Sequence, residues 1–512
     1  MQNVHPLRSP FPPLVAAVTA ASLTLALPAQ DAAAPEDADI REAIVDEFVA
    51  DPAVPAFLID VQAMDGIVTL QGTSDNILAK ERAAAIARTV KGVRAVVDRV
   101  RVVPPADLDA TALRDDVRQA LIVDPATDAF EVRVSVDDAG EVTLNGKVQS
   151  WAERSLCGTV ARSVAGVTEV DNAITVDFTA ARADAEIRSE IAQRLRWDML
   201  IDDGLVDVVC VDGEVALSGV VGSAAERMRA RNAAWVAGVA AVDDDGLEVR
   251  GWARDAALRG SKYAVRSDEQ IADAVEAALL QDPRVASFDV ATEVDGGAVT
   301  LRGKVDNLMA RRAAAADARN TVGVVTVRNR IAVEPTAARS GVAIERAVRD
   351  ALRRDPYVDR FDVRVDVRNG MAHLYGAVDT DFERARADDV TSRVLGVVGV
   401  DNHLEVGDPH ITSYDPYVDP WPVHDYDWYH YSPVVTFTAD AEIRQCIEDQ
   451  LWWSPFVDSE QVDVAVDDGT VTLTGTVDSR AERIAATENA YDGGAVWVVN
   501  RLELAPPGGQ DE

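Results

Sequence analysis

Apolar residues recur at every fourth position in five segments of the chain, a spacing that places them on one side of a helix. Each segment is therefore predicted to be an amphipathic helix carrying the triplet Ile40-Ile44-Phe48, Leu113-Val117-Leu121, Ile187-Ile191-Leu195, Ile344-Val348-Leu352 or Ile443-Ile447-Leu451. An Asp or Ser often precedes the helix, and we expect it to cap the first turn, as at Asp268. Proline cannot continue a helix, so the Asp-Pro pairs at 51–52, 124–125, 282–283 and 355–356 predict where helices end.

Alternation of apolar and polar residues follows the helix, most clearly over 361–367. A period of two predicts a β-strand with one buried face. Hairpin turns are predicted where Asp-Gly or Asn-Gly can accept a positive φ, at 65–66, 212–213, 369–370 and 468–469. The returning strand ends in a phrase such as Val-Thr-Leu-x-Gly, whose glycine indicates a bulge or a close backbone approach. This structural glycine recurs as Gly72, Gly146, Gly219, Gly303, Gly376 and Gly475.

A second helix, rich in Ala and Arg, is predicted over segments such as 80–90, 311–322 and 384–394. It ends at another glycine, which suits the left-handed conformation that often follows a helix. A last strand comes next, as over 324–333. The landmarks of this unit repeat six times. We therefore predict an α+β fold, a tandem array of six small αββαβ modules, each with two helices on one face of a three-stranded sheet.

The unit, with Asp-Pro after its first helix, DGxVTLxG at its hairpin and GVxxVxN before its last strand, resembles the BON domain. The resemblance covers 38–103, 110–177, 184–249, 268–334, 341–407 and 439–505. Copy three departs most, because it lacks Asp-Pro and carries Asp243-Asp244-Asp245-Gly246 before its last strand. The resemblance implies a periplasmic or envelope-associated protein that binds phospholipid and maintains the envelope under osmotic stress. It implies no enzyme activity.

The first 30 residues resemble a cleavable signal peptide. Arg8 precedes an apolar stretch of small residues over 14–27, and a polar, Pro-containing segment follows. This pattern predicts export to the periplasm, with an uncleaved signal anchor as the alternative. The three cysteines, Cys157, Cys210 and Cys446, fall in different modules and give no disulfide framework. We expect them to be buried small side chains.

The net charge of −37 disfavours nucleic acid and, on average, anionic membranes. Membrane contact would need a local basic patch, and two regions offer one. The second helices carry Lys80, Arg82 and Arg88 in copy one and Arg227, Arg229 and Arg231 in copy three. The linker 250–267 combines basic and aromatic residues suited to lipid headgroups, namely Arg250, Trp252, Arg254, Arg259, Lys262 and Tyr263. The alternatives are salt-bridged solvent faces for the helices and a solvated or docked segment for the linker.

The insertion 408–438 is rich in Tyr, Trp, Pro and His. It is expected either to pack on modules five and six or to serve as a docking surface for a partner, glycan or membrane. Its His410, His424 and His430 lack the spacing of a compact metal site, so we predict no metal there.

No motif for nucleophilic, phosphate or metallopeptidase chemistry is present, and the module explains His373 and His403 without catalysis. We therefore predict a non-catalytic protein without cofactors, nucleic-acid partners or a small-molecule substrate. The expected partners are membrane phospholipid or envelope proteins. The rival prediction is a structural or protein-interaction array in the periplasm that does not bind lipid.

Overall fold

The computed structural model describes residues 35–127, 131–178, 182–254, 266–286, 288–336, 339–359, 361–407, 418, 440–454, 457–467 and 469–505. The predicted signal peptide and, apart from Val418, the aromatic insertion lie outside these residues. Among the described helices, none has the length and apolar composition needed to cross a bilayer.

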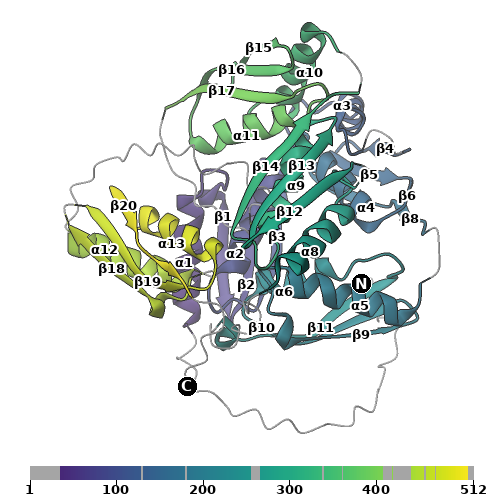
Figure 1. The fold of residues 1–512 in the computed structure, drawn as a ribbon. Helices are drawn as coiled ribbons and strands as arrows, with labels where there is room; N and C mark the ends of the chain where they lie inside the picture. The colour runs from purple at the N-terminus through teal and green to yellow at the C-terminus, as the bar shows by residue number, and fades with distance from the viewer. Residues whose placement is uncertain are drawn as a thin grey trace, which may run out of the picture. The chain divides into compact units, whose positions relative to one another are not determined.

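The first module shows the repeated unit in full. Its elements are α1 (Asp37–Ala50), the 3₁₀ turn η1 (Ala56–Leu58), β1 (Ile59–Met64), β2 (Ile67–Ser74), α2 (Ile77–Thr89) and β3 (Ala95–Val102). β2 is the central strand, antiparallel to β1 and parallel to β3. α1 packs on β1, α2 packs on β3, and the two helices contact each other (Figure 1). The predicted αββαβ fold is thus confirmed.

The other modules repeat this order. Module two has α3 (Ala110–Val123), β4 (Arg133–Val136), β5 (Glu141–Asn145), β6 (Lys147–Val148), α4 (Trp151–Arg162), β7 (Glu169–Asn172) and β8 (Thr175–Val176). Module three has α5 (Asp184–Trp197), η2 (Asp203–Leu205), β9 (Val206–Val211), β10 (Glu214–Val221), α6 (Ala224–Ala233) and β11 (Ala241–Val249), and is followed by η3 (Gly251–Arg254). Module four has α8 (Asp268–Gln281), β12 (Val290–Asp295), β13 (Ala298–Val305), α9 (Leu308–Arg319) and β14 (Thr326–Val333).

Modules five and six complete the array. Module five has α10 (Gly341–Arg354), β15 (Arg364–Arg368), β16 (Met371–Val378), α11 (Asp381–Ser392) and β17 (Gly399–Val406). Module six has α12 (Asp440–Trp453), η5 (Ser459–Gln461), β18 (Val462–Asp467), β19 (Thr470–Val477), α13 (Arg480–Asp492), β20 (Trp497–Asn500) and β21 (Glu503–Leu504).

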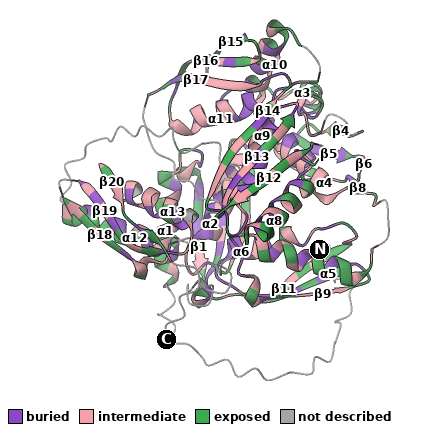
Figure 2. Ribbon diagram, viewed as in Figure 1, coloured by how far each residue is buried: buried purple, intermediate pink, exposed green. Residues whose placement is uncertain are grey.

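Each module buries its own apolar stripe. In module three, Ile187, Ile191 and Leu195 of α5 cluster with Leu217 of β10 and Leu247 of β11. The opposite face of each sheet carries the alternate residues, which are exposed or half-buried (Figure 2). The two helices therefore cover one face only, and the open face of the sheet is left to contact solvent or a ligand.

The expected role of Asp268 as a helix cap is wrong. Ser267 is the N-cap of α8 and forms a capping box with Gln270. The Asp268 carboxylate instead accepts the backbone N–H groups of Gly296 and Gly297 at 2.9 and 3.0 Å. Asp37 and Asp184 make the same pair of bonds in modules one and three. This aspartate therefore ties the first helix to the hairpin turn.

The structural glycine makes a close backbone approach, which is one of the two roles that the sequence predicts for it. Gly72 has φ +129°, and a Cβ placed on it would lie 2.0 Å from the carbonyl oxygen of Leu58. The equivalent glycines at 219, 303, 376 and 475 also have positive φ. Gly146 is not among the positive-φ glycines and separates β5 from β6.

The three cysteines differ in burial. Cys157 is buried as expected, Cys210 is half-buried and Cys446 is exposed. The expectation of burial is wrong for Cys446, because the side chain lies on the outer side of α12, away from the buried stripe Ile443, Ile447 and Leu451.

Glu482 predicts a pH-dependent stability for module six. Its carboxylate accepts the backbone N–H groups of Asp458 and Asp478 at 3.0 and 2.7 Å, and the side chain is buried. Burial raises the pKa of Glu482 from 4.5 to about 7, although the two backbone N–H groups lower it. The folded state thus holds an extra proton between these values. The resulting stabilisation is complete below the unfolded pKa and is lost as the pH rises through the folded pKa, by about 3 kcal/mol in total.

Denaturant titrations at pH 5 and pH 8, read by pulse proteolysis and mass spectrometry of residues 439–506, would check this expectation. Glu482→Gln is expected to remove most of the difference between the two pH values for this module, because glutamine does not titrate. An equal pH dependence in the variant and the natural protein would contradict it.

Candidate surface-contact sites

Two of the predicted lipid-contact arginines each form an ion pair within their own module. Arg82 lies 2.7 Å from Asp51, and Arg229 lies 2.7 Å from Asp198. The aspartate is in each case the residue that ends the first helix, 31 residues before the arginine. Its carboxylate also accepts the backbone N–H two residues further on, from Ala53 or Leu200. Copy three thus retains the ion-pairing aspartate although it lacks Asp-Pro.

The remaining second-helix residues also meet carboxylates of their own module. Lys80 lies 3.9 Å from Asp98, and Arg227 lies 2.8 Å from Asp244 and 3.5 Å from Asp245. Arg231 lies 3.5 Å from Asp244. Arg88 is half-buried, and burial lowers its pKa against the opposing effect of Asp98 and Glu81. These side chains therefore do not form a continuous, unpaired basic face.

The linker residues are only partly described. Arg250 is exposed and pairs with Glu248 at 2.7 Å, and Trp252 is half-buried in η3. Arg254 is the last residue of η3. Arg259, Lys262 and Tyr263 lie outside the described residues.

An exposed apolar tip on module one is a surface that the sequence reasoning missed. We define the apolar tip as Phe57 and Leu58 of η1 with Val103, whose side chains are 95%, 54% and 52% exposed. The fold brings them to one end of the sheet. The Leu58 carbonyl lies against Gly72 near the end of β2, and the Val103 backbone N–H donates to Ser74 at 2.8 Å.

Charged residues flank the apolar tip. Arg101 pairs in register with Thr73, at the same end of the sheet, and Arg99 lies two residues before it on the same face. Both arginines are exposed and form no ion pair with another described residue. Asp60 and Asp75 are the exposed acidic residues at this end.

The sequence alone does not single out the tip. Modules three and six have the same 3₁₀ turn, but it reads Asp203-Gly204-Leu205 and Ser459-Glu460-Gln461, whereas module one has Ala56-Phe57-Leu58. Modules four and five also have phenylalanine at the position of Phe57, but their Phe288 and Phe361 pack against the module core, so the exposure of Phe57 is what sets module one apart.

The repeated unit, with its internal ion pairs and open sheet faces, defines a tandem array of small α+β modules. The family model of the BON domain matches residues 36–104, 109–177, 183–251, 267–335, 340–408 and 439–506. The chain therefore belongs to the BON domain family, and the resemblance seen in the sequence is confirmed.

Individual proteins match a smaller part of the chain than the family model does. The chain is 29% identical over 144 residues to the osmotically-inducible protein Y of Escherichia coli (strain K12), an alignment that covers 27% of this chain and 72% of that protein. Two structures of CdsD, a structural protein of the type III secretion system of Chlamydia trachomatis, also match. They share 16% and 15% identity, cover 40% and 41% of this chain and 91% and 98% of theirs, and have a TM-score of 0.12. A TM-score this low is not a basis for comparing folds.

Proposed function

We propose that this chain is a non-catalytic periplasmic protein that contacts envelope phospholipid and helps to maintain the envelope under osmotic stress. Membership of the BON family and the relative named for osmotic induction support the cellular setting. The apolar tip of module one carries the proposal for lipid contact, because a 95% exposed Phe57 at the same end of the sheet as the exposed Arg101 suits the boundary between headgroups and acyl chains.

A membrane-contact role for the tip follows from its chemistry. Transferring a phenylalanine side chain from water to an apolar environment is worth about 1.5–3 kcal/mol. Arg99 and Arg101 would lie near the lipid phosphates when Phe57 and Leu58 enter the boundary between headgroups and acyl chains. One such contact is weak, and six linked modules can add further weak contacts.

Vesicle flotation tests this proposal. The purified protein is expected to float with vesicles of phosphatidylglycerol and phosphatidylcholine. Phe57→Glu is expected to weaken partitioning about 10–100-fold, the factor that corresponds to losing one buried aromatic side chain. Glu460→Ala, in the equivalent turn of module six, is the matched control and should leave partitioning unchanged. Failure of the natural protein to float with these vesicles would overturn the lipid proposal.

A structural or protein-interaction array is the second candidate function. The observation that favours it is the pairing of Arg82, Arg227 and Arg229 with carboxylates, which removes basic groups from the helical surface. The net charge of −37 also disfavours anionic surfaces. This candidate expects no vesicle binding and a protein partner recovered by crosslinking in envelope extracts.

A further inference from the structure

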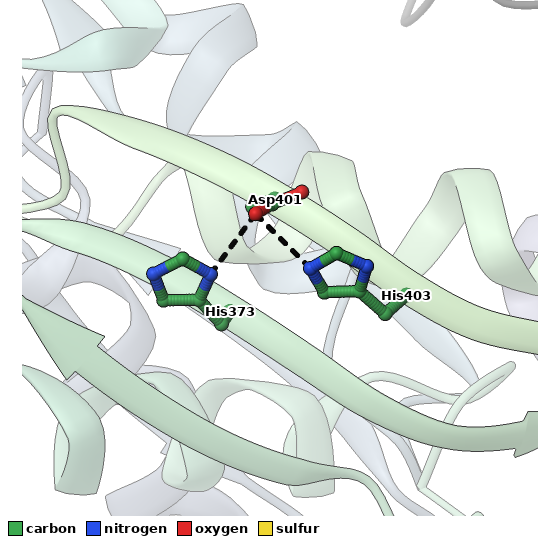
Figure 3. A group of neighbouring side chains, drawn as sticks. All are labelled: His373, Asp401 and His403. Carbon is green, nitrogen blue, oxygen red and sulfur yellow. Dashed lines mark hydrogen bonds and ion pairs between the residues drawn. The ribbon is translucent and has the colours of Figure 1, made fainter.

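The open sheet face of module five holds two histidines and an aspartate in reach of one another. His373 on β16 is the cross-strand partner of Asp401 on β17, and His403 lies two residues beyond Asp401 on the same face. His373 Nδ1 and His403 Nε2 each lie 3.0 Å from Asp401 Oδ2. One ligand atom from each residue lies within 4.8 Å of the others. Figure 3 shows the Asp401 carboxylate between the two imidazoles.

The sheet fixes the directions of these side chains. The His403 ring stacks on Tyr375, its register partner, with centroids 5.0 Å apart and planes 10° apart. The two imidazoles are also nearly parallel, at 6° and 6.2 Å. The Arg364 guanidinium lies over the Tyr375 ring, 4.8 Å from the ring centroid. Because regular strands set the backbone and aromatic stacking sets one ring, little ordering remains to be done when a ligand binds.

The other five modules provide an internal comparison. The residues in register with His373 and Asp401 are Thr69 and Val97, Thr143 and Asp171, Ala216 and Asp243, Thr300 and Arg328, and Thr472 and Val499. The residues at the position of His403 are Arg99, Ala173, Gly246, Arg330 and Arg501. The module folds without any imidazole at these places, so the fold does not require the cluster.

We propose that His373, Asp401 and His403 bind a divalent transition-metal ion, with Zn²⁺ the preferred ion. Two imidazole nitrogens and one carboxylate oxygen form a donor set that Zn²⁺ takes in open sites, where water fills the remaining position. Ca²⁺ and Mg²⁺ prefer all-oxygen sites and match this set poorly.

The three side chains are exposed enough to take up an ion from solvent and close enough together to coordinate it. The side chains of His373, Asp401 and His403 are 22%, 43% and 46% exposed, so an ion reaches them from solvent. Their ligand atoms need only small rotations to reach the roughly 2.0–2.2 Å bonds that Zn²⁺ forms with nitrogen and oxygen. A further carboxylate on this face is that of Asp366, the cross-strand partner of His373, which pairs with Arg368 at 2.7 Å.

The test measures Zn²⁺ binding to the full chain by competition with a chromophoric chelator, and Co²⁺ binding by visible absorption. His373→Thr and His403→Arg place the residues of sister modules at these positions, so the fold is expected to persist. The natural protein is expected to bind one equivalent of Zn²⁺ at this site. Each variant should weaken that binding by more than 10–100-fold, since even outer-shell partners of a metal are worth about that much.

The other histidines of the chain provide the control. A variant with His5, His410, His424 and His430 all changed to glutamine is expected to keep the Zn²⁺ affinity and the Co²⁺ spectrum. The proposal is overturned if the natural protein shows no saturable binding, if both sheet variants bind as it does, or if only the glutamine variant loses binding. Circular dichroism of the sheet variants confirms that any loss is not unfolding.

Discussion

Changing Gly72 to alanine is expected to unfold module one. The new Cβ would lie 2.0 Å from the Leu58 carbonyl oxygen, and φ of +129° is a conformation that residues with a side chain rarely adopt. Both partners are backbone at the junction of η1, β1 and β2, so no side chain can move aside. We expect a cost of more than about 4 kcal/mol, in the range that marks a specific structural failure.

Hydrogen exchange with mass spectrometry is the suitable measurement, because six modules in one chain do not give a single two-state transition. Peptides within residues 36–104 should lose protection while the other modules keep theirs. Gly251→Ala is the matched control, since a Cβ there would meet nothing within 4 Å and its φ is not positive. It is expected to change stability by less than about 0.5 kcal/mol. Retained protection in the Gly72 variant would show that the backbone can shift, contrary to this expectation.

The fold was predictable because its signals are local and repeat. Ile40, Ile44 and Phe48 at helical spacing, a turn at Asp65-Gly66 and a glycine at position 72 each reflect a short stretch of backbone, and six copies confirm one another. The family resemblance rested on the same residues. The role of Asp268 was misjudged because a carboxylate near a helix start can satisfy either its own helix or a hairpin 28 residues away, and only packing decides between them.

The surface was less predictable than the core. Arg82 and Arg229 were counted as available cations because a sequence shows composition but not pairing. The spacing of 31 residues between the helix-ending aspartate and the arginine, which recurs in modules one and three, is a sequence signal for this ion pair. His373 and Asp401 are 28 residues apart and meet only because β16 and β17 pair in parallel in one register. Each histidine considered alone gave no reason to expect the cluster.

Module five contains a deeply buried example of the helix-linking ion pair, and breaking it is expected to have a large effect. Arg386 of α11 lies 2.6 Å from Asp355, the residue after α10, and the two side chains are 16% and 2% exposed. Burial alone would lower the pKa of Arg386, but Asp355 and Asp389 outweigh it and raise the pKa above its ordinary value. Removing one partner of a buried pair leaves an uncompensated charge and costs about 3–5 kcal/mol.

Arg386→Met is therefore expected to lower the stability of residues 340–408 by about 3–5 kcal/mol, measured by pulse proteolysis across a denaturant series. Asp355→Asn separates the two roles of the aspartate, since asparagine keeps an acceptor for the Tyr357 backbone N–H at 3.1 Å but lacks the charge. It should be destabilising as well. The double variant should cost less than the sum of the two single changes, because neither charge is then left alone.

The exposed pair of Lys304 and Glu334 is the control for burial. It has a similar separation of 2.8 Å, but its side chains are 70% and 57% exposed. Glu334→Gln is expected to cost less than about 1 kcal/mol, since water and salt screen such pairs. If Arg386→Met costs no more than Glu334→Gln, the pair does not hold α10 to α11.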